Sequence, residues 1–170
     1  VPNWTTTHFP RYCLPLIRRH HRLYMMPKIE LYPLGRMEVQ LGEPVNVGGG
    51  PKGSRVVIDV PAVRLTGERI NAELATNDAA DWATFSEDGK LASLDVRLTL
   101  KTHDGAFIYV EYTGRMDVDA GLIAVAPTFE TGSEEYAWIN AVQAVAAGQV
   151  DMASGLLVYN IYEARPVAGE

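Results

Sequence analysis

The sequence feature that most constrains the fold of this chain is the tripeptide His103-Asp104-Gly105. It lies between two segments in which apolar and polar residues alternate. Segments 91–102 and 106–116 each alternate apolar and polar residues, the period of a β-strand with one buried face. An Asp-Gly step between two such runs is typical of a β-hairpin. The chain is therefore expected to contain antiparallel β-structure.

The chemistry of the two segments favours one register for this hairpin. A two-residue loop would place Leu100 opposite Tyr109 and mix apolar with polar groups on each face. A three-residue loop with a bulge at Gly105 gives a face that is entirely apolar or aromatic: Leu94, Val96, Leu98, Leu100, Ile108, Val110 and Tyr112. It also places Arg97 opposite Glu111, and opposite charges in such a pair favour the register. We predict the three-residue, bulged turn.

Similar alternation recurs through most of the chain after Met26. The other alternating segments are 29–41, 54–65, 69–75, 135–146 and 155–164. Residues 139–147 are also helical by propensity, so a helix competes with a strand there. We expect the glycine-rich stretch 48–53 to form a turn. Many short strands joined by loops rich in Gly, Pro, Asp and Asn predict a single all-β domain. A closed antiparallel barrel is favoured because it removes exposed sheet edges.

The charge of the chain is unevenly distributed. The 170 residues carry a formal charge of −6, yet residues 1–25 contain four arginines and no acid: Arg11, Arg18, Arg19 and Arg22. Residues 26–170 are left with 11 basic and 21 acidic residues, a net charge of −10. An acidic domain is a poor match for nucleic acid, because neutralising phosphates supplies most of that affinity. We expect no nucleic-acid partner.

Three interpretations of the basic leader remain open. The first is a secretory signal, which needs an apolar region after its positive charges. No such region follows the basic residues 18–22, so the sequence argues against it. A basic arm that binds nucleic acid or a membrane is the second interpretation. We favour the third, a disordered or over-extended start at 1–25, with the natural chain beginning at Met25 or Met26 and the barrel domain at 26–170.

Several kinds of site are excluded by residue type. One cysteine, Cys13, cannot form a disulfide within the chain, and only His103 lies in the barrel domain, so the usual zinc site cannot form there. No serine lies in a Gly-x-Ser-x-Gly context, and no dinucleotide fingerprint is present. No apolar run approaches the roughly 20 residues of a membrane helix. We expect a cytoplasmic protein with no metal, no cofactor and no membrane partner.

The polar face of the central hairpin has two interpretations. Periodicity alone favours a face turned to water, with a weak surface pair between Arg97 and Glu111. If the face lines a barrel lumen instead, Asp95 and Glu111 are candidate general bases. Arg97 and Tyr109 would then donate hydrogen bonds to a carbonyl or carboxylate. Asp95, Arg97, Tyr109 and Glu111 are thus the candidate catalytic residues.

Further polar and aromatic residues are candidates for holding a ligand. They are Arg115, Glu130, Trp138, Asn140 and Tyr159. If 135–146 is a strand, then Tyr136, Trp138 and Asn140 share one face. Asn140 stands among apolar neighbours, and a buried amide needs hydrogen-bond partners from the protein or a ligand.

Several short pieces of the sequence together resemble one protein family. They are Pro51-Lys52-Gly53-Ser54-Arg55, Gly67-Glu68-Arg69-Ile70, Asp81-Trp82, Leu94-Asp95-Val96-Arg97, Thr102-His103-Asp104-Gly105-Ala106, Ile108-Tyr109-Val110, Gly114-Arg115, Phe129-Glu130-Thr131-Gly132, Tyr136-Ala137-Trp138-Ile139-Asn140 and Val158-Tyr159-Asn160-Ile161-Tyr162-Glu163. Their order and spacing resemble the family known as domain of unknown function 3237, uncharacterised bacterial and fungal proteins. The resemblance runs from about Leu31 to Glu163. It implies a calycin-like antiparallel β-barrel with a central cavity and no established reaction. The chain departs from the family pattern at 61–64, 79–80 and His103.

Three functions follow as hypotheses, and the sequence leaves open whether the protein is an enzyme. The first is binding of a small carbonyl- or carboxylate-bearing molecule in the cavity, with cofactor-independent isomerase, cyclase or hydratase chemistry. The second is a carrier or sensor without chemistry, and the third is a structural oligomer of identical chains. The direction of the odd-numbered side chains of 95–99 and 107–113 distinguishes them, because the first hypothesis needs them to point inward.

Overall fold

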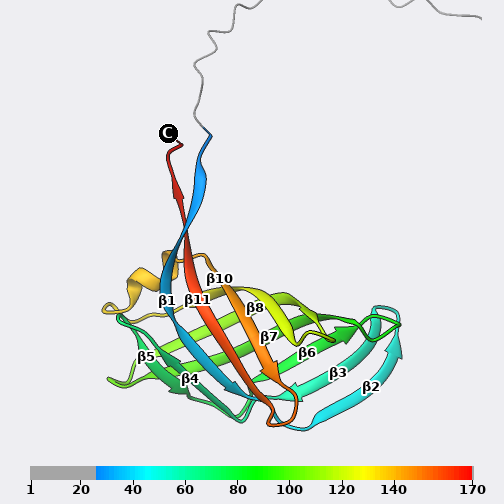
Figure 1. Cartoon of the computed structure of the whole chain (residues 1–170). Helices are drawn as coiled ribbons and strands as arrows, with labels where there is room; N and C mark the ends of the chain where they lie inside the picture. The colour runs from blue at the N-terminus through cyan, green and yellow to red at the C-terminus, as the bar shows by residue number, and fades with distance from the viewer. Residues whose placement is uncertain (1–25, 170) are drawn as a thin grey trace, which may run out of the picture.

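Eleven β-strands and one short 3-10 helix are present in residues 26–169, the part of the chain that this computed structural model describes (Figure 1). The strands are β1 (Lys28–Gln40), β2 (Pro44–Gly50), β3 (Gly53–Asp59), β4 (Ala62–Thr66), β5 (Asn71–Leu74), β6 (Ala80–Phe85), β7 (Leu91–Thr102), β8 (Phe107–Asp117), β9 (Leu122–Glu130), β10 (Ala144–Asp151) and β11 (Leu156–Val167), and the helix is η1 (Ala137–Ala141). Eight strands close into an antiparallel barrel in the order β7-β5-β4-β1-β11-β10-β9-β8, with β8 pairing back to β7. The predicted all-β antiparallel barrel is confirmed.

The central hairpin has the register that the sequence predicts. Arg97 pairs with Glu111, and Leu98 pairs with Val110. Gly105 in the turn has a φ of 97°, a left-handed conformation that favours glycine. The prediction of a three-residue turn is confirmed.

Strand β7 is shared between two halves of the sheet. Its last residues pair with β5 through Leu74 and Leu100, whereas its first half pairs with β6 through Asp81 and Val96. Strands β3 and β2 continue outward from β6, and Figure 1 shows them curving away from the barrel. This extension places β3 and β6 beside the polar face of the hairpin.

The barrel interior is filled by alternate side chains of each strand, those that point inward. The even-numbered residues of β7 from Ala92 to Leu100 are all buried, as are Ile108 and Val110 of β8. Tyr112 and Tyr159 meet in this core edge to face, with ring centroids 5.9 Å apart. Burial therefore follows the period of two that the hairpin sequence displays.

Two segments differ from the predicted strands. The expected strand 54–65 is split, because β3 ends at Asp59 and β4 begins at Ala62, with Pro61 between them. Proline has no N–H to donate to a sheet, so it ends the ladder there. The expected strand 135–146 is wrong over its first half, which forms η1 through bonds such as Ile139 N–H to the Tyr136 carbonyl at 2.9 Å.

Three strands were not among the predicted elements, namely β2, β6 and β9. The turn expected at 48–53 is confirmed at Pro51 and Lys52 only, because Gly48 to Gly50 end strand β2 and Gly53 begins β3. Glycine and alanine blur the alternation in β2 and β6, so neither shows a clear polar and apolar pattern. The predicted leader, 1–25, lies outside the described residues, and its role and the cytoplasmic location stay predictions.

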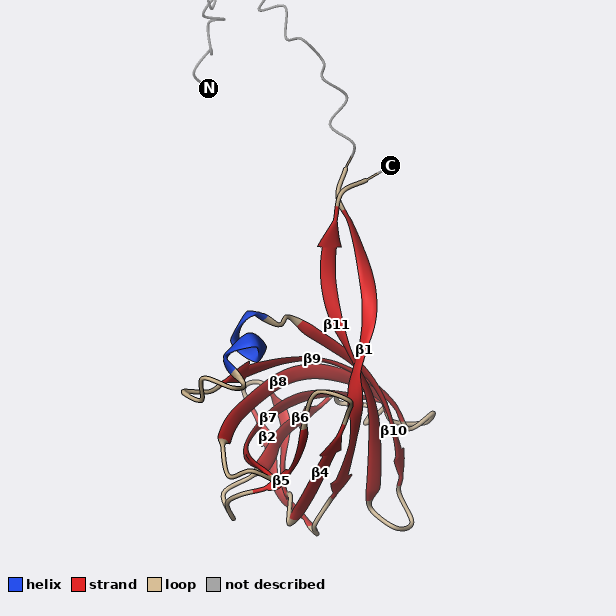
Figure 2. Cartoon of the chain, turned by 90° about the vertical axis from the view of Figure 1, so that its left-hand side faces the viewer, coloured by secondary structure: helices blue, strands red, loops and turns tan. Residues whose placement is uncertain are grey.

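Strands β1 and β11 extend beyond the barrel as a two-stranded ribbon. Figure 2 shows this ribbon projecting from the top of the barrel, with the ends of the described chain beyond it. Lys28 pairs with Val167 at its outer end and Pro33 with Tyr162 near its base. Strand β4 pairs with β1 only from Arg36 onward, and β10 pairs with β11 only as far as Glu163. Only the outer part of the ribbon, 28–31 with 164–167, is therefore a sheet of two strands.

One carboxyl group is buried among the core residues. Asp81 of β6 pairs with Val96 and is 5% exposed, and its Oδ1 accepts a hydrogen bond of 3.0 Å from the Asp95 backbone N–H. Burial disfavours the charged carboxylate and raises the pKa of Asp81 to about 6, although the Asp95 N–H and Arg55 favour the charged form. Asp81 therefore titrates near neutral pH in the folded protein.

Packing around Tyr159 makes Gly148 of β10 sensitive to substitution. A Cβ at Gly148 would lie 2.4 Å from Cε1 of Tyr159, which is fully buried. We expect Gly148→Ala to lower the free energy of unfolding by about 1–3 kcal/mol, measured by urea denaturation, because this core cannot expand without strain. Gly49→Ala is the control, since nothing lies within 4 Å of its Cβ position. Equal stability of the two variants would contradict this packing.

Asp81 predicts a pH dependence of stability. Its pKa is about 6 when folded and 3.8 in the reference state, so the native state binds more protons between these values. The contribution of Asp81 is therefore most favourable below about pH 4 and declines as pH rises through 6. Between about pH 4 and pH 8, wild type should lose on the order of 2–3 kcal/mol relative to Asp81→Asn in urea denaturation. Asp119→Asn, in an exposed turn, is the control, and parallel pH profiles for wild type and Asp81→Asn would refute the prediction.

Candidate functional site

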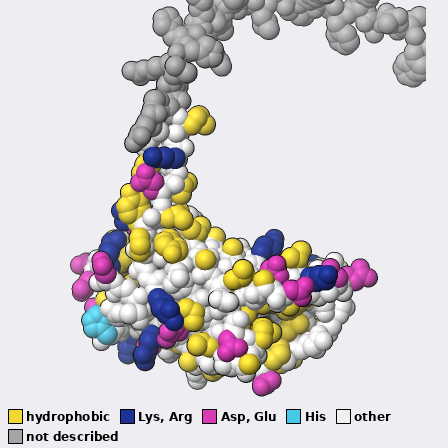
Figure 3. All heavy atoms as spheres, in the orientation of Figure 1, with side chains coloured by type: hydrophobic (Ala, Val, Ile, Leu, Met, Phe, Trp, Pro, Cys, Tyr) yellow, Lys and Arg dark blue, Asp and Glu magenta, His cyan; other side chains and the backbone are white. Residues whose placement is uncertain are grey.

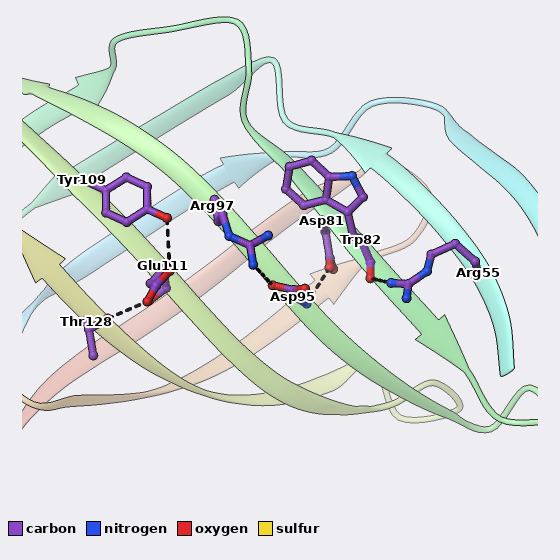
Figure 4. A network of polar contacts seen from close by, with 8 residues as sticks. All are labelled: Arg55, Asp81, Trp82, Asp95, Arg97, Tyr109, Glu111 and Thr128. Carbon is purple, nitrogen blue, oxygen red and sulfur yellow. Dashed lines mark hydrogen bonds and ion pairs between the residues drawn. The ribbon is translucent and has the colours of Figure 1, made fainter. Parts of the chain in front are cut away.

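The polar side chains of the central hairpin lie on the outer face of the barrel (Figure 4). The side chains of Asp95 and Arg97 are 43% and 48% exposed, whereas their neighbours Leu94 and Val96 are buried. The hypothesis that this face lines a lumen is therefore wrong. The interior needs the apolar face of β7, which leaves the polar face turned outward.

Arg97 has a different ion-pair partner from the expected one. Although Glu111 is its cross-strand neighbour, the Arg97 guanidinium pairs with Asp95 on its own strand at 3.2 Å. Glu111 instead accepts a hydrogen bond of 3.1 Å from the Tyr109 hydroxyl. Burial and the Glu111 carboxylate raise the pKa of Tyr109, which keeps this phenol a donor. All four candidate catalytic residues thus lie on one exposed surface.

A basic groove of about 440 Å³ crosses this surface from the β2–β3 turn to β8. Its lining includes four cations and one carboxylate: Lys52, Arg55, Arg97, Arg115 and Asp95. Trp82 of β6 forms part of the wall, and the Arg97 guanidinium lies 5.6 Å from the centre of its ring. We call this feature the basic groove.

Neutral oxygens hold two of the groove arginines. The Arg115 guanidinium donates to Ser93 Oγ at 2.9 Å and to the Gly114 carbonyl at 2.8 Å. The Arg55 guanidinium donates to the Trp82 carbonyl, as Figure 4 shows. In the part of the chain that the structure describes, no carboxylate lies within ion-pair distance of Arg55, Arg115 or Lys52. The groove therefore concentrates positive charge on a domain of net negative charge.

The candidate ligand residues fall into different places. Arg115 lies in the basic groove, whereas Glu130 and Asn140 line a separate outer groove of about 540 Å³ beside Tyr109. Tyr159 is fully buried, and its hydroxyl has no hydrogen-bond partner among the described residues. Burial raises the pKa of Tyr159 well above its ordinary value, so the phenol is neutral. Tyr159 is therefore a core residue.

Helix η1 changes the roles expected for its residues. The Asn140 side chain is exposed and bridges the backbone of Thr131, accepting from its N–H at 2.8 Å and donating to its carbonyl at 2.9 Å. Trp138 lies under the Arg69 guanidinium, 3.5 Å from the ring centre. Tyr136 is buried and donates to Asp104 Oδ2 at 3.0 Å. These residues thus hold the 131–141 segment in place and do not share one strand face.

Sequence reasoning missed Lys52, Arg55, Trp82 and Asp81 as residues of this region. Arg55 reaches the hairpin through the pairing of β3 with β6 and of β6 with β7. Asp81 lies behind the groove and contacts it through the Asp95 N–H. Only the family resemblance drew attention to these segments, because their pairing is long-range.

Two further properties bear on the kind of site. Residues 26–169 contain no group of three or more His, Cys, Asp or Glu side chains placed to hold a metal ion. No helix in the same range is long and apolar enough to cross a membrane.

Comparison with solved structures supports the fold. A beta-barrel like protein from Acinetobacter baumannii AYE is 28% identical, with a TM-score of 0.74 over 84% of this chain and 99% of that chain. A conserved protein of unknown function from Rhodopseudomonas palustris is 20% identical, with a TM-score of 0.73 over 82% and 100%. An enzyme from Penicillium herquei is also 20% identical, with a TM-score of 0.58 over 82% and 95%.

The chain matches no curated protein. A family model does match it, over residues 29–126, which is more than half of its length. The matched region spans the basic groove and the central hairpin. The chain therefore belongs to the family described as "Protein of unknown function (DUF3237)".

Proposed function

We propose that the protein binds a small organic anion, bearing a carboxylate and a planar apolar part, in the basic groove. The observation that carries the proposal is the grouping of Lys52, Arg55 and Arg115, without carboxylate partners among the described residues, on a domain of net charge −10. Like charges placed together raise the local free energy, and a bound anion relieves it. The ligand class is the one expected from the sequence, a small carboxylate-bearing molecule. The proposed binding site lies on the outer face of the barrel and not in its lumen.

The arginines are arranged to meet an oxyanion with little reorganisation. A guanidinium has five N–H donors, and Arg55 and Arg115 use only some of them on neutral protein oxygens. These contacts fix the side chains while leaving donors and charge for a ligand. Charge-assisted hydrogen bonds of this kind are about twice as strong as neutral ones.

Trp82 and Arg97 supply the apolar and orienting side of the groove. Arg97 is positioned by its ion pair with Asp95 at 3.2 Å and lies 5.6 Å from the Trp82 ring centre. An indole wall favours a flat ligand, since aromatic faces stack on planar groups. An aromatic carboxylate matches both halves of this surface.

The geometry favours binding over acid–base chemistry. The carboxyl with a pKa near 6, Asp81, lies on the inner face of the sheet, separated from the groove by the β7 backbone. The carboxylate within the groove, Asp95, is exposed and already paired with Arg97. A carrier or sensor role therefore fits the groove better than an isomerase, cyclase or hydratase.

Replacement of Arg97 tests the proposal. With 2-naphthoate as the probe in isothermal titration calorimetry, we expect Arg97→Ala to weaken binding about tenfold or more, the loss of one hydrogen bond to a charged group. Its free energy of unfolding should fall by no more than about 1 kcal/mol, because exposed ion pairs contribute little.

Arg36→Ala is the matched control for this experiment. Arg36 lies on β1 and pairs with Glu38, two residues away, at 3.1 Å, so it repeats the Arg97–Asp95 arrangement elsewhere on the surface. It should leave 2-naphthoate binding unchanged, and the neutral 2-naphthamide should bind wild type far more weakly than 2-naphthoate. The proposal fails if wild type does not distinguish the acid from the amide, or if the two arginine variants bind alike.

A further inference from the structure

One carboxyl group lies directly behind the basic groove. Asp81 of β6 is 5% exposed, and its Oδ1 accepts the backbone N–H of Asp95 at 3.0 Å, a contact that Figure 4 shows. The side chain of Asp95 lines the groove on the other face of β7. The buried carboxyl and the groove are therefore separated by the backbone of one strand.

The surroundings of Asp81 do little to stabilise its charged form. Among the described residues, no cation lies within ion-pair distance of this carboxyl, and the Asp95 N–H is the one donor to its side chain. Tyr112 of β8 and Tyr159 of β11 face it from the core, and burial raises the pKa of both phenols, so neither is charged. A carboxyl in such a place favours its protonated form. A pKa of about 6 for Asp81, raised chiefly by burial, agrees with this arrangement.

Two charged groups of the groove act on Asp81 in opposite directions. The Arg55 guanidinium of β3 favours the Asp81 carboxylate, whereas the Asp95 carboxylate of β7 opposes it. Arg55 has no carboxylate within ion-pair distance in the described chain, so its charge is available to a ligand anion in the groove. Such an anion would cancel the charge that favours ionised Asp81 and would add a negative charge across β7.

We propose that an anion in the basic groove and a proton on Asp81 stabilise each other, so that the protein takes up a proton as it binds its ligand. The inference rests on the proposed function and adds a regulation of the same site, in which acidification tightens binding. The anion and the proton need no direct contact, because the coupling is electrostatic and acts equally in both directions.

The expected coupling is about tenfold in the dissociation constant. A like charge about 10 Å away, at an effective dielectric constant of about 20, changes a binding constant by roughly this factor. More distant surface charges contribute less, because water and salt screen them. Figure 3 shows acidic and basic side chains interspersed over one face of the molecule. Asp81 is therefore the carboxyl from which we expect the pH dependence to arise.

Titration of the full chain with 2-naphthoate tests the inference. This probe stays ionised above about pH 5, as carboxylates do. In isothermal titration calorimetry, its Kd should be lowest near pH 5, rise as Asp81 ionises around pH 6, and be about tenfold higher at pH 8. In a pH-stat titration at pH 6.5 without buffer, binding should consume roughly half an equivalent of acid per ligand.

Two variants identify the group that takes up the proton. Asp81→Asn is a neutral isostere, so it should bind 2-naphthoate at pH 8 as tightly as wild type does at pH 5, and should consume no acid. Histidine is the other side chain that commonly changes charge between pH 5 and 8. His103, the one histidine among residues 26–169, lies in the β7–β8 turn and outside the basic groove. His103→Gln is therefore the control and should keep the pH dependence of wild type.

The outcomes separate this inference from the proposed function. No binding at any pH would overturn both. Binding with the same Kd at pH 5 and pH 8, or a pH dependence that persists in Asp81→Asn, would overturn the inference alone.

Nuclear magnetic resonance offers a second measurement on wild type, which needs no variant to fold. The carboxyl ¹³C resonance of Asp81 should titrate with its midpoint at higher pH when 2-naphthoate is bound than in the free protein. An unchanged midpoint in the saturated complex would also overturn the inference.

Discussion

The register of the β7–β8 hairpin is the constraint on which the rest of the structure depends. Strand β7 pairs with β8 along its whole length and with both β5 and β6 on its other edge, so three strands inherit its alignment. A slip of one residue would exchange its buried and exposed faces. The left-handed turn at Gly105 and the uniformly apolar inner face hold one alignment, and core and outer surface follow from it.

The basic groove depends on the same alignment at longer range. Strand β6 pairs with the first half of β7, and β3 pairs with β6, which brings Arg55 and Trp82 beside Asp95 and Arg97. Neutral oxygens fix Arg55 and Arg115 without cancelling their charge. Positive potential therefore persists at one place on an acidic domain, which is the physical basis for proposing an anionic ligand.

In β1, the same alternation of apolar and polar residues gives buried side chains in one half of the strand and exposed side chains in the other. In the barrel half of β1, Met37 and Val39 are 1% exposed, whereas Ile29 and Leu31 in the ribbon half are largely exposed. The alternation is the same in both halves. What differs is the neighbouring strand, because β4 and β10 pair only with the barrel halves of β1 and β11. Burial is thus decided by the neighbouring strands and not by the alternation itself.

The sequence by itself determined the all-β class, the bulged turn at Gly105 and the strand register that sets Arg97 opposite Glu111. These features depend on residues that are neighbours along the chain. It did not determine which face of the hairpin looks inward, since a lumen-facing and a solvent-facing polar face have the same period of two. It also misassigned the first half of 135–146 as a strand, because local hydrogen bonds such as that at Ile139 form a 3-10 turn there, whereas 144–146 belong to β10 as expected. Only the tertiary structure shows that Tyr159 and Asn140 lie outside the basic groove. It also shows that Trp82 lines the groove and that Asp81 lies behind it. The physical reason is that burial and long-range sheet pairing are decided by strands distant in sequence, whose order no local pattern records.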